Sequence, residues 1–265
     1  MILELLDILS ILVTLLFFSI GSYYDLKLRE VSDKLWLVYA PIGLGLTTGR
    51  LILEPSTLRV IAISGVITIL IAFGLFYLGL FGGADAKAIL CLGATIPITP
   101  NVYQPAMGYV HPFFPLMVVI MSYLCSVAVI LWLGCSNICR YIGSGGKIFR
   151  GLEESWWRKI MACITGYPVK FAKLRSTFYL YPMEEIIETV KGPQRVFKLF
   201  VSAEEDRSEE VAKLAGQLSR INYLGEVWVT PGLPHLVFLM LAIIITLAVG
   251  DPLFVTVMKF SHLSL

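Results

Sequence analysis

The stretch Gly-Leu-Phe-Gly-Gly-Ala-Asp-Ala-Lys, residues 79 to 87, decides how this chain is organised. It places the carboxylate of Asp85 directly after an uncharged run from Val60 to Ala84. Placing a carboxylate at the end of such an apolar run costs free energy, so acids at such positions usually have a function. Asp85 is therefore the first candidate functional residue.

The composition is that of a membrane protein. Hydrophobic residues make up 57% of the 265 residues and charged residues only 15%, and the mean hydropathy is +0.80. This is too apolar for a soluble domain and predicts a chain that crosses the bilayer several times. The sequence holds no HExxH motif and no closely spaced His ligands. No metal, cofactor or nucleic-acid partner is expected.

Six apolar segments predict six transmembrane helices. The predicted spans are 8–24, 35–53, 58–81, a short segment from Asp85 to the Pro97 and Pro100 pair, 115–133 and 233–250. The fourth segment has about 12 residues, roughly 18 Å of helix, which is well short of a ~30 Å hydrocarbon core. A short fourth helix fits a site that must admit water below the membrane surface.

Two features inside the spans predict how they are placed. Ser64, Thr68 and Ala72 recur every four residues and form a small-residue stripe that lets another helix approach closely. Arg50 lies near the end of the second span, so it is expected to snorkel toward the interface.

Residues 140 to 230 are different and hold most of the charged residues. They predict a small α/β domain outside the bilayer, opened by an amphipathic interfacial helix at Ser155 to Lys159 that carries Trp156 and Trp157. The elements expected after it are strands at 177–181, 195–201 and 225–229 and helices at 183–191 and 204–220.

Lys and Arg set the orientation. Basic residues follow the first and third spans and fill the insert, whereas the amino terminus and residues 101–115 have none. The positive-inside rule then makes the insert cytoplasmic, with Arg50 and Arg59 as a minor contrary signal. The predicted organisation is transmembrane helices over 1–139, a cytoplasmic domain over 140–230, and a last transmembrane helix and tail over 231–265.

The order of the spans gives Asp85 a partner. Asp25 follows the first span, the next two spans cross the membrane and return, and Asp85 follows the third. Both acids are therefore expected at the same face of the membrane. Two carboxylates close together in a low-dielectric place share a proton, so one can act as base on water while the other protonates a carbonyl. This is the arrangement of an aspartic protease.

Other interpretations of these acids stay open. Asp85 could simply cap the helix that it opens, and Asp25 could be one of the acids that are common just outside a span. Asp33 is a rival partner in the same loop. A pair of acids could also bind ions or relay protons in a transporter, although the sequence has neither inverted repeats nor a charge at the membrane midplane.

The motifs resemble those of the archaeal preflagellin peptidases, in the type IV prepilin peptidase family of GxGD-type intramembrane aspartyl proteases. The resemblance rests on Asp25-x-Lys-x-Arg-x-Val-Ser-Asp33 after the first span, and on Gly82-Gly83-Ala84-Asp85 after the third. It covers essentially the whole chain. One departure is that Ala84 occupies the third position of GxGD, where alanine still permits close backbone approach.

The resemblance implies a multi-pass protein of the cell membrane with Asp25 and Asp85 as the catalytic pair. Its activity would be removal of the short basic leader of preflagellin or pilin-like precursors at the cytoplasmic face. Gly82 and Gly83 would let the backbone approach the substrate. Glu30 and Asp33 are candidates for attracting the basic leader, or are ordinary solvated loop residues.

Overall fold

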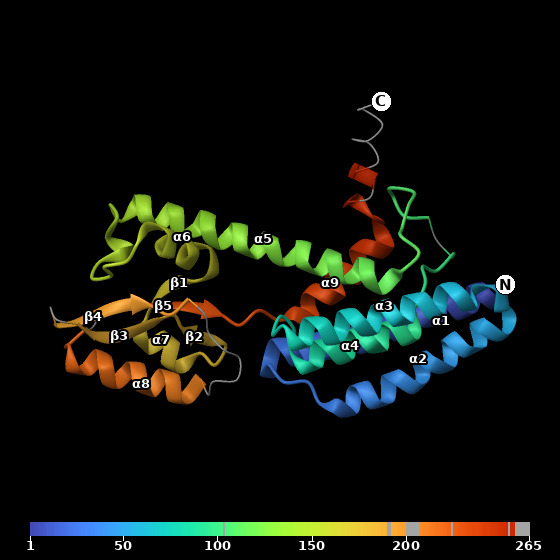
Figure 1. The fold of residues 1–265 in the computed structure, drawn as a ribbon, viewed down its shortest axis with the longest axis horizontal. Helices are drawn as coiled ribbons and strands as arrows, with labels where there is room; N and C mark the ends of the chain where they lie inside the picture. Colours follow the sequence, from blue (N-terminus) through green and yellow to red (C-terminus); the bar gives the residue numbers. More distant parts are fainter. Residues whose placement is uncertain (103, 190–191, 200–206, 224, 254, 258–265) are drawn as a thin grey trace. The chain divides into compact units, whose positions relative to one another are not determined.

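A computed structural model describes the chain except for residues 103, 190–191, 200–206, 224, 254 and 258–265 (Figure 1). The helices are α1 (Ile2–Leu28), α2 (Asp33–Leu53), α3 (Leu58–Tyr77), α4 (Gly83–Thr95), α5 (Phe114–Gly143), α6 (Trp156–Thr165), α7 (Phe171–Ser176), α8 (Arg207–Arg220) and α9 (His235–Ala248). The strands are β1 (Tyr167–Lys170), β2 (Leu180–Pro182), β3 (Glu184–Thr189), β4 (Gly192–Phe197) and β5 (Glu226–Pro231). The chain divides into two compact units, unit 1 (1–126 and 234–265) and unit 2 (127–233).

Among the described residues, four helices are long and apolar enough to cross a membrane: α1, α2, α3 with the turn before it, and α5. The helix α4 has 13 residues, and α9 is a shorter apolar helix of 14 residues. At 1.5 Å per residue, α4 is about 20 Å long, less than a ~30 Å hydrocarbon core. The prediction of a short fourth helix is confirmed.

Small residues bring α4 into the centre of unit 1, against α2 and α3 (Figure 1). A Cβ atom on Gly93 of α4 would lie 2.6 Å from the Thr68 side chain, and one on Gly43 of α2 would collide with Thr95. The predicted stripe of α3 is buried at Ser64, Thr68 and Ala72. These helices therefore approach more closely than larger side chains would permit.

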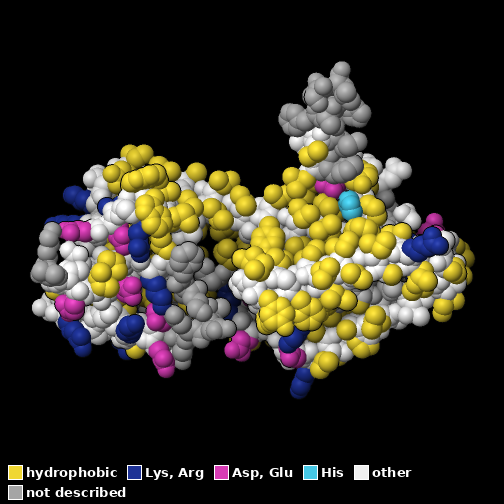
Figure 2. Space-filling view, viewed as in Figure 1, with side chains coloured by type: hydrophobic (Ala, Val, Ile, Leu, Met, Phe, Trp, Pro, Cys, Tyr) yellow, Lys and Arg dark blue, Asp and Glu magenta, His cyan; other side chains and the backbone are white. Residues whose placement is uncertain are grey.

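Unit 1 presents apolar side chains to its surroundings. Figure 2 shows hydrophobic side chains over much of the visible face of the unit that carries α1 to α4. Leu16 of α1, Leu37 of α2 and Leu70 of α3 are 57%, 71% and 66% exposed. An exposed apolar surface of this extent is expected where helices contact lipid.

The structure corrects the expectation for Arg50. Its guanidinium does not snorkel: Arg50 is 7% exposed and forms an ion pair with the buried Asp7 of α1. The other carboxylate oxygen of Asp7 accepts the backbone N–H of Asn101 at 3.0 Å. A buried cation needs such a partner, because an unpaired charge in an apolar setting is costly.

Unit 2 is an α/β unit with two antiparallel sheets. One has the order β1-β5-β2, and the other is the β3–β4 hairpin. The predicted helix over 183–191 is wrong for its described part, because residues 184 to 189 form β3 and pair with β4. The predicted strand at 177–181 overlaps β2 only at Leu180 and Tyr181.

The other elements predicted for the insert are present where the structure describes them. The strand β5 matches the expected 225–229 strand, and α8 matches the expected helix from residue 207 onward. Strand β4 covers the start of the 195–201 prediction. Residues 200–201 and 204–206 of these predictions lie outside the described residues. The amphipathic helix is α6, with Trp156 74% and Trp157 50% exposed.

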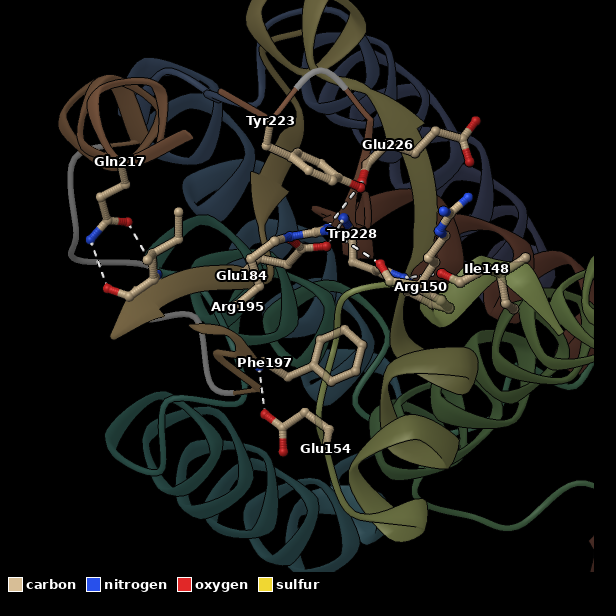
Figure 3. A network of polar contacts seen from close by, with 11 residues as sticks. Ile148, Arg150, Glu154, Glu184, Arg195, Phe197, Gln217, Tyr223, Glu226 and Trp228 are labelled. Atoms are coloured by element: carbon tan, nitrogen blue, oxygen red, sulfur yellow. Dashed lines mark hydrogen bonds and ion pairs between the residues drawn. The ribbon is translucent and has the colours of Figure 1, made fainter. Parts of the chain in front are cut away.

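A buried ion pair organises the core of unit 2 (Figure 3). Arg195 of β4 binds Glu184 of β3 through two nitrogens at 2.6 and 2.9 Å, and both side chains are at most 5% exposed. Glu184 also accepts the backbone N–H of Trp228 at 2.7 Å, and the Arg195 guanidinium lies over the ring of Tyr223. Burial raises the pKa of the Glu184 carboxyl, and the nearby guanidinium opposes that shift.

Candidate active site

Asp25 lies in the last turn of α1, which continues to Leu28. Its side chain is 15% exposed, and its Oδ2 accepts the backbone N–H of Leu236 at 3.2 Å. Its Oδ1 is 4.0 Å from the Arg29 guanidinium. The first residues of α9 therefore hold the carboxylate of an acid more than 200 residues earlier in the chain.

Asp85 lies in the first turn of α4 and is half-buried. Its Oδ2 accepts the backbone N–H of Gly82, the N-cap residue of the helix, at 3.1 Å. Asp85 thus helps to satisfy the helix start from the first turn, although Gly82 and not Asp85 is the N-cap residue. This hydrogen bond occupies one oxygen only: Oδ1 has no hydrogen bond among the residues that the structure describes.

The two acids lie at the same end of unit 1. The chain leaves Asp25 at the end of α1, crosses twice in α2 and α3, and returns to Asp85 at the start of α4. The negative charges of Asp25 and Asp85 are close enough to interact. The amino ends of α4 and α9 both contribute N–H groups to these acids, and such helix ends favour negative charge.

The other acidic candidates lie outside this pair. Asp33 begins α2 and forms an exposed ion pair with Lys87 of α4 at 2.6 Å. Its carboxylate thus faces a cation and does not pair with Asp85. Glu30 is exposed in the turn between α1 and α2. Both remain available for long-range attraction of a cationic ligand.

Neither motif glycine has a left-handed backbone, and a Cβ atom would fit easily at Gly83 but tightly at Gly82, where it would lie 3.3 Å from Asp85 Oδ2. Gly82 has a φ of −72°, and the left-handed glycine of this loop is Gly79, with a φ of 68°. A Cβ on Gly83 would meet only Phe76, at 3.9 Å. Ala84 is half-buried and packs against the core of unit 1. The absent side chain of Gly83 is therefore not required by internal packing.

Three groups near the two acids were not predicted from the sequence. They are the Leu236 N–H group at Asp25, Tyr123 of α5 near the charge of Asp85, and His235, which precedes Leu236. Pro234 before His235 is a local signal for a helix start. Nothing local indicates that this helix end meets the end of α1.

Within the described part of the chain, no group of three or more His, Cys, Asp or Glu side chains could hold a metal ion. The chemistry that the arrangement does supply is acid–base chemistry. Oδ1 of Asp85 has no hydrogen bond among the described residues, and the carboxylate of Asp25 lies within electrostatic reach of it.

Two family models match the chain. Residues 12–133 match the type IV leader peptidase family, a range that contains both Asp25 and Asp85. Residues 158–252 match the archaeal peptidase A24 C-terminus, type II. Together the matches cover parts of both structural units.

Curated relatives match over most of the chain. A preflagellin peptidase of Methanocaldococcus jannaschii is 27% identical over 239 residues, which is 88% of this chain and 90% of the relative. Preflagellin peptidases of Methanococcus voltae and Methanococcus maripaludis are 29% and 24% identical over 240 residues, again 88% of this chain and 91% of each relative. This chain is therefore a peptidase and belongs to the type IV leader peptidase family.

Proposed function

We propose that this peptidase is an intramembrane aspartyl endopeptidase that removes the short basic leader from preflagellin or pilin-like precursors. The relatives that match over 88% of the chain are named preflagellin peptidases, which supports the substrate class. Asp25 and Asp85 are the proposed catalytic pair. The observation that carries this assignment is their convergence at one end of unit 1, where their charges interact.

The chemistry follows from two carboxylates that share one proton. The ionised carboxylate takes a proton from water as the water oxygen attacks the carbonyl carbon of the scissile peptide bond. The protonated carboxyl gives its proton to the carbonyl oxygen, which yields a tetrahedral diol. As the C–N bond breaks, the carboxyl that took the water proton gives it to the amine nitrogen, while the other carboxylate takes a proton from a diol hydroxyl and the carbonyl reforms. The pair then holds one proton again.

The membrane arrangement is part of this proposal. We place six spans in the membrane, with α4 and α9 as the short ones, a cytoplasmic α/β domain over 140–230, and the site at the cytoplasmic face. The Asp7–Arg50 ion pair supports this orientation. Arg50 is a contrary signal for the positive-inside rule, and Asp7 balances its charge. Helix α6, with its exposed tryptophans, suits the lipid headgroup region.

A basic leader would be attracted to this face by Glu30 and, more weakly, by Asp33. Asp33 is partly neutralised by its ion pair with Lys87, whereas Glu30 has no such partner among the described residues. Long-range attraction of this kind accelerates encounter and weakens with added salt.

The transporter alternative is not favoured, because the family models and the curated relatives all describe peptidases. Because the same two acids could serve a transporter, an experiment should also test for transport. Ion flux driven by a voltage or pH gradient in vesicles is the measurement that would support it.

The deciding experiment is cleavage of a preflagellin-like peptide by membranes carrying Asp25→Asn, Asp85→Asn or Asp33→Asn. We expect the first two variants to lose about 100- to 10,000-fold in rate, while Asp33→Asn stays near wild type. Asparagine at position 85 keeps an oxygen that can accept the Gly82 N–H, so this hydrogen bond survives the change.

Cleavage by all three variants would overturn the catalytic pair. Loss in Asp33→Asn together with only one of the other two would move the partner assignment to Asp33. Thermal unfolding of each variant in detergent is the control, since a loss of activity counts only in a folded protein.

A further inference from the structure

An aromatic cluster of Phe81, Tyr123 and His235 lies beside the two acids. The rings of Phe81 and Tyr123 are stacked, with centroids 5.7 Å apart and planes 5° from parallel. The His235 ring is 4.6 Å from Phe81 and 5.6 Å from Tyr123. The three side chains come from the loop before α4, from α5 and from the first position of α9.

The cluster contains two polar atoms without partners. Tyr123 Oη and His235 Nε2 are buried, and neither has a hydrogen-bond partner among the described residues. A buried polar atom without a partner is unfavourable, and most such atoms in folded proteins are satisfied. Two of them in one small cluster therefore point to a ligand with polar groups of its own.

Both atoms belong to residues that lie near the two acids in unit 1. Tyr123 lies within the electrostatic reach of Asp85. His235 directly precedes Leu236, whose N–H binds Asp25. A ligand that reached both unpartnered atoms would therefore lie at the end of unit 1 that holds the two carboxylates.

Phe81 packs against the two rings that carry these atoms. It is 4% exposed and contacts both rings, yet it comes from the short loop between α3 and α4. That loop contains the left-handed Gly79, with open space around it, and Gly82, whose only close neighbour is Asp85. Gly79 is therefore the point of this loop at which the backbone can pivot at the least steric cost.

We propose that Tyr123 and His235 bind the main chain of the substrate beside the scissile bond, after Phe81 swings away. An extended peptide offers the carbonyl and N–H groups that these two atoms lack. This inference rests on the proposed function and adds residues to the same site. Their hydrogen bonds would form only when a substrate is bound, as happens for other enzyme groups.

The test uses Tyr123→Phe and His235→Phe, which remove the polar atoms but keep aromatic rings. Binding of a preflagellin-like peptide is measured with both catalytic candidates changed to Asn, and cleavage is measured with them intact. Loss of one hydrogen bond should weaken binding about fivefold. It should raise KM by a similar factor with kcat little changed, because the bond contributes to ground and transition states alike.

Tyr77→Phe is the matched control, since Tyr77 ends α3 and is 81% exposed. It should bind and cut like wild type. Phe81→Leu, which has a smaller apolar side chain, should raise the association rate of the peptide, and thermal unfolding in detergent shows that the variant is folded. If His235→Phe does not fold, Tyr123→Phe with Phe81→Leu decides the outcome.

Wild-type affinity and KM in Tyr123→Phe, with cleavage that still requires the two acids, would overturn this inference and leave the proposed function intact. An association rate in Phe81→Leu at or below that of wild type would overturn the covering role. A wild-type protein that neither binds nor cuts the peptide would instead count against the proposed function.

Discussion

The two carboxylate oxygens of Asp85 have different surroundings. Its Oδ2 accepts the N–H of the N-cap residue Gly82, and its Oδ1 has no hydrogen-bond partner in the described part of the chain. The hydrogen bond to Gly82 fixes the rotation of the side chain, so the second oxygen is held in place before a substrate arrives. Positioning of a catalytic group in advance is worth several orders of magnitude in rate. The structural and proposed catalytic roles of Asp85 therefore support each other.

A substitution at Gly83 tests whether this single residue is needed for cleavage. Its missing side chain leaves open space, because a Cβ atom added there would have Phe76, 3.9 Å away, as its nearest neighbour. We expect Gly83→Val to fold normally but to cut at a rate lower by about tenfold or more, because a side chain beside Asp85 displaces the substrate backbone. Thermal unfolding and peptide cleavage in the same detergent measure the two effects.

Gly65→Val is the control for that substitution. Gly65 also lies on a helix, and a Cβ atom added to it would meet nothing within 4 Å, but it is remote in sequence from the motif. It should retain activity. Equal activity per folded molecule in Gly83→Val and Gly65→Val would refute a role for Gly83 in substrate approach.

The motif residues could be predicted from sequence, whereas their partners could not. Asp25 and Asp85 stand out because an acid beside an apolar run is unusual, and counting spans returns both to one face. The Leu236 N–H group and the Tyr123 ring reach the site only through the packing of α5 and α9. The expectation for Arg50 is wrong for the same reason, since its partner Asp7 lies 43 residues earlier.

At the scale of elements, the helix α4 depends on close approach by its neighbours. A Cβ on Gly93 would lie 2.6 Å from the Thr68 side chain, whereas one on Gly45 of α2 would meet nothing within 4 Å. We expect Gly93→Ala to destabilise unit 1 by about 1–3 kcal/mol through overpacking. Gly45→Ala should be neutral or slightly stabilising, because alanine is the better helix former.

Thermal unfolding in detergent, followed by circular dichroism, compares the two glycine variants. A Thr68→Ala change added to Gly93→Ala should recover part of the lost stability, since it removes the colliding methyl and hydroxyl groups. Equal unfolding temperatures for Gly93→Ala and Gly45→Ala would show that the small-residue seam does not limit packing.

The wrongly predicted helix at 183–191 shows where prediction from sequence patterns is weakest. A short segment with Ile186, Ile187 and Thr189 fits a helix or a strand, because β-branched residues favour strands while the segment is too short for a clear period. The hairpin register decides it, with Glu184 opposite Phe197 and Thr189 opposite Gly192. Only in a strand does Glu184 point inward to Arg195.

At the scale of the whole molecule, the apolar helices and the α/β insert follow from composition. Four helices carry a clear membrane signal. The spanning roles of α4 and α9 and the boundaries at 139/140 and 230/231 stay predictions. The reason is physical: a helix of 13 or 14 residues is too short for hydropathy to separate a thinned span from a buried core helix.

Each unit has its own buried core, which predicts that the two can unfold separately. The core of unit 1 gathers around α4, whereas the cores of unit 2 lie around its strands and α8. Glu184→Gln removes the charge that compensates the buried Arg195 guanidinium. We expect it to destabilise unit 2 by about 3–5 kcal/mol, the usual effect of leaving a buried charge unpaired.

Hydrogen exchange resolved along the chain measures this directly. Protection should fall in β3, β4 and β5 and stay at the wild-type level in α1, α3 and α4, because the lost ion pair belongs to unit 2 alone. Glu188→Gln, an exposed position on the same strand, is the matched control and should change neither unit. An equal loss of protection in both units would mean that they unfold as one cooperative body, and the proposed catalytic end of unit 1 would then depend on the insert for its stability.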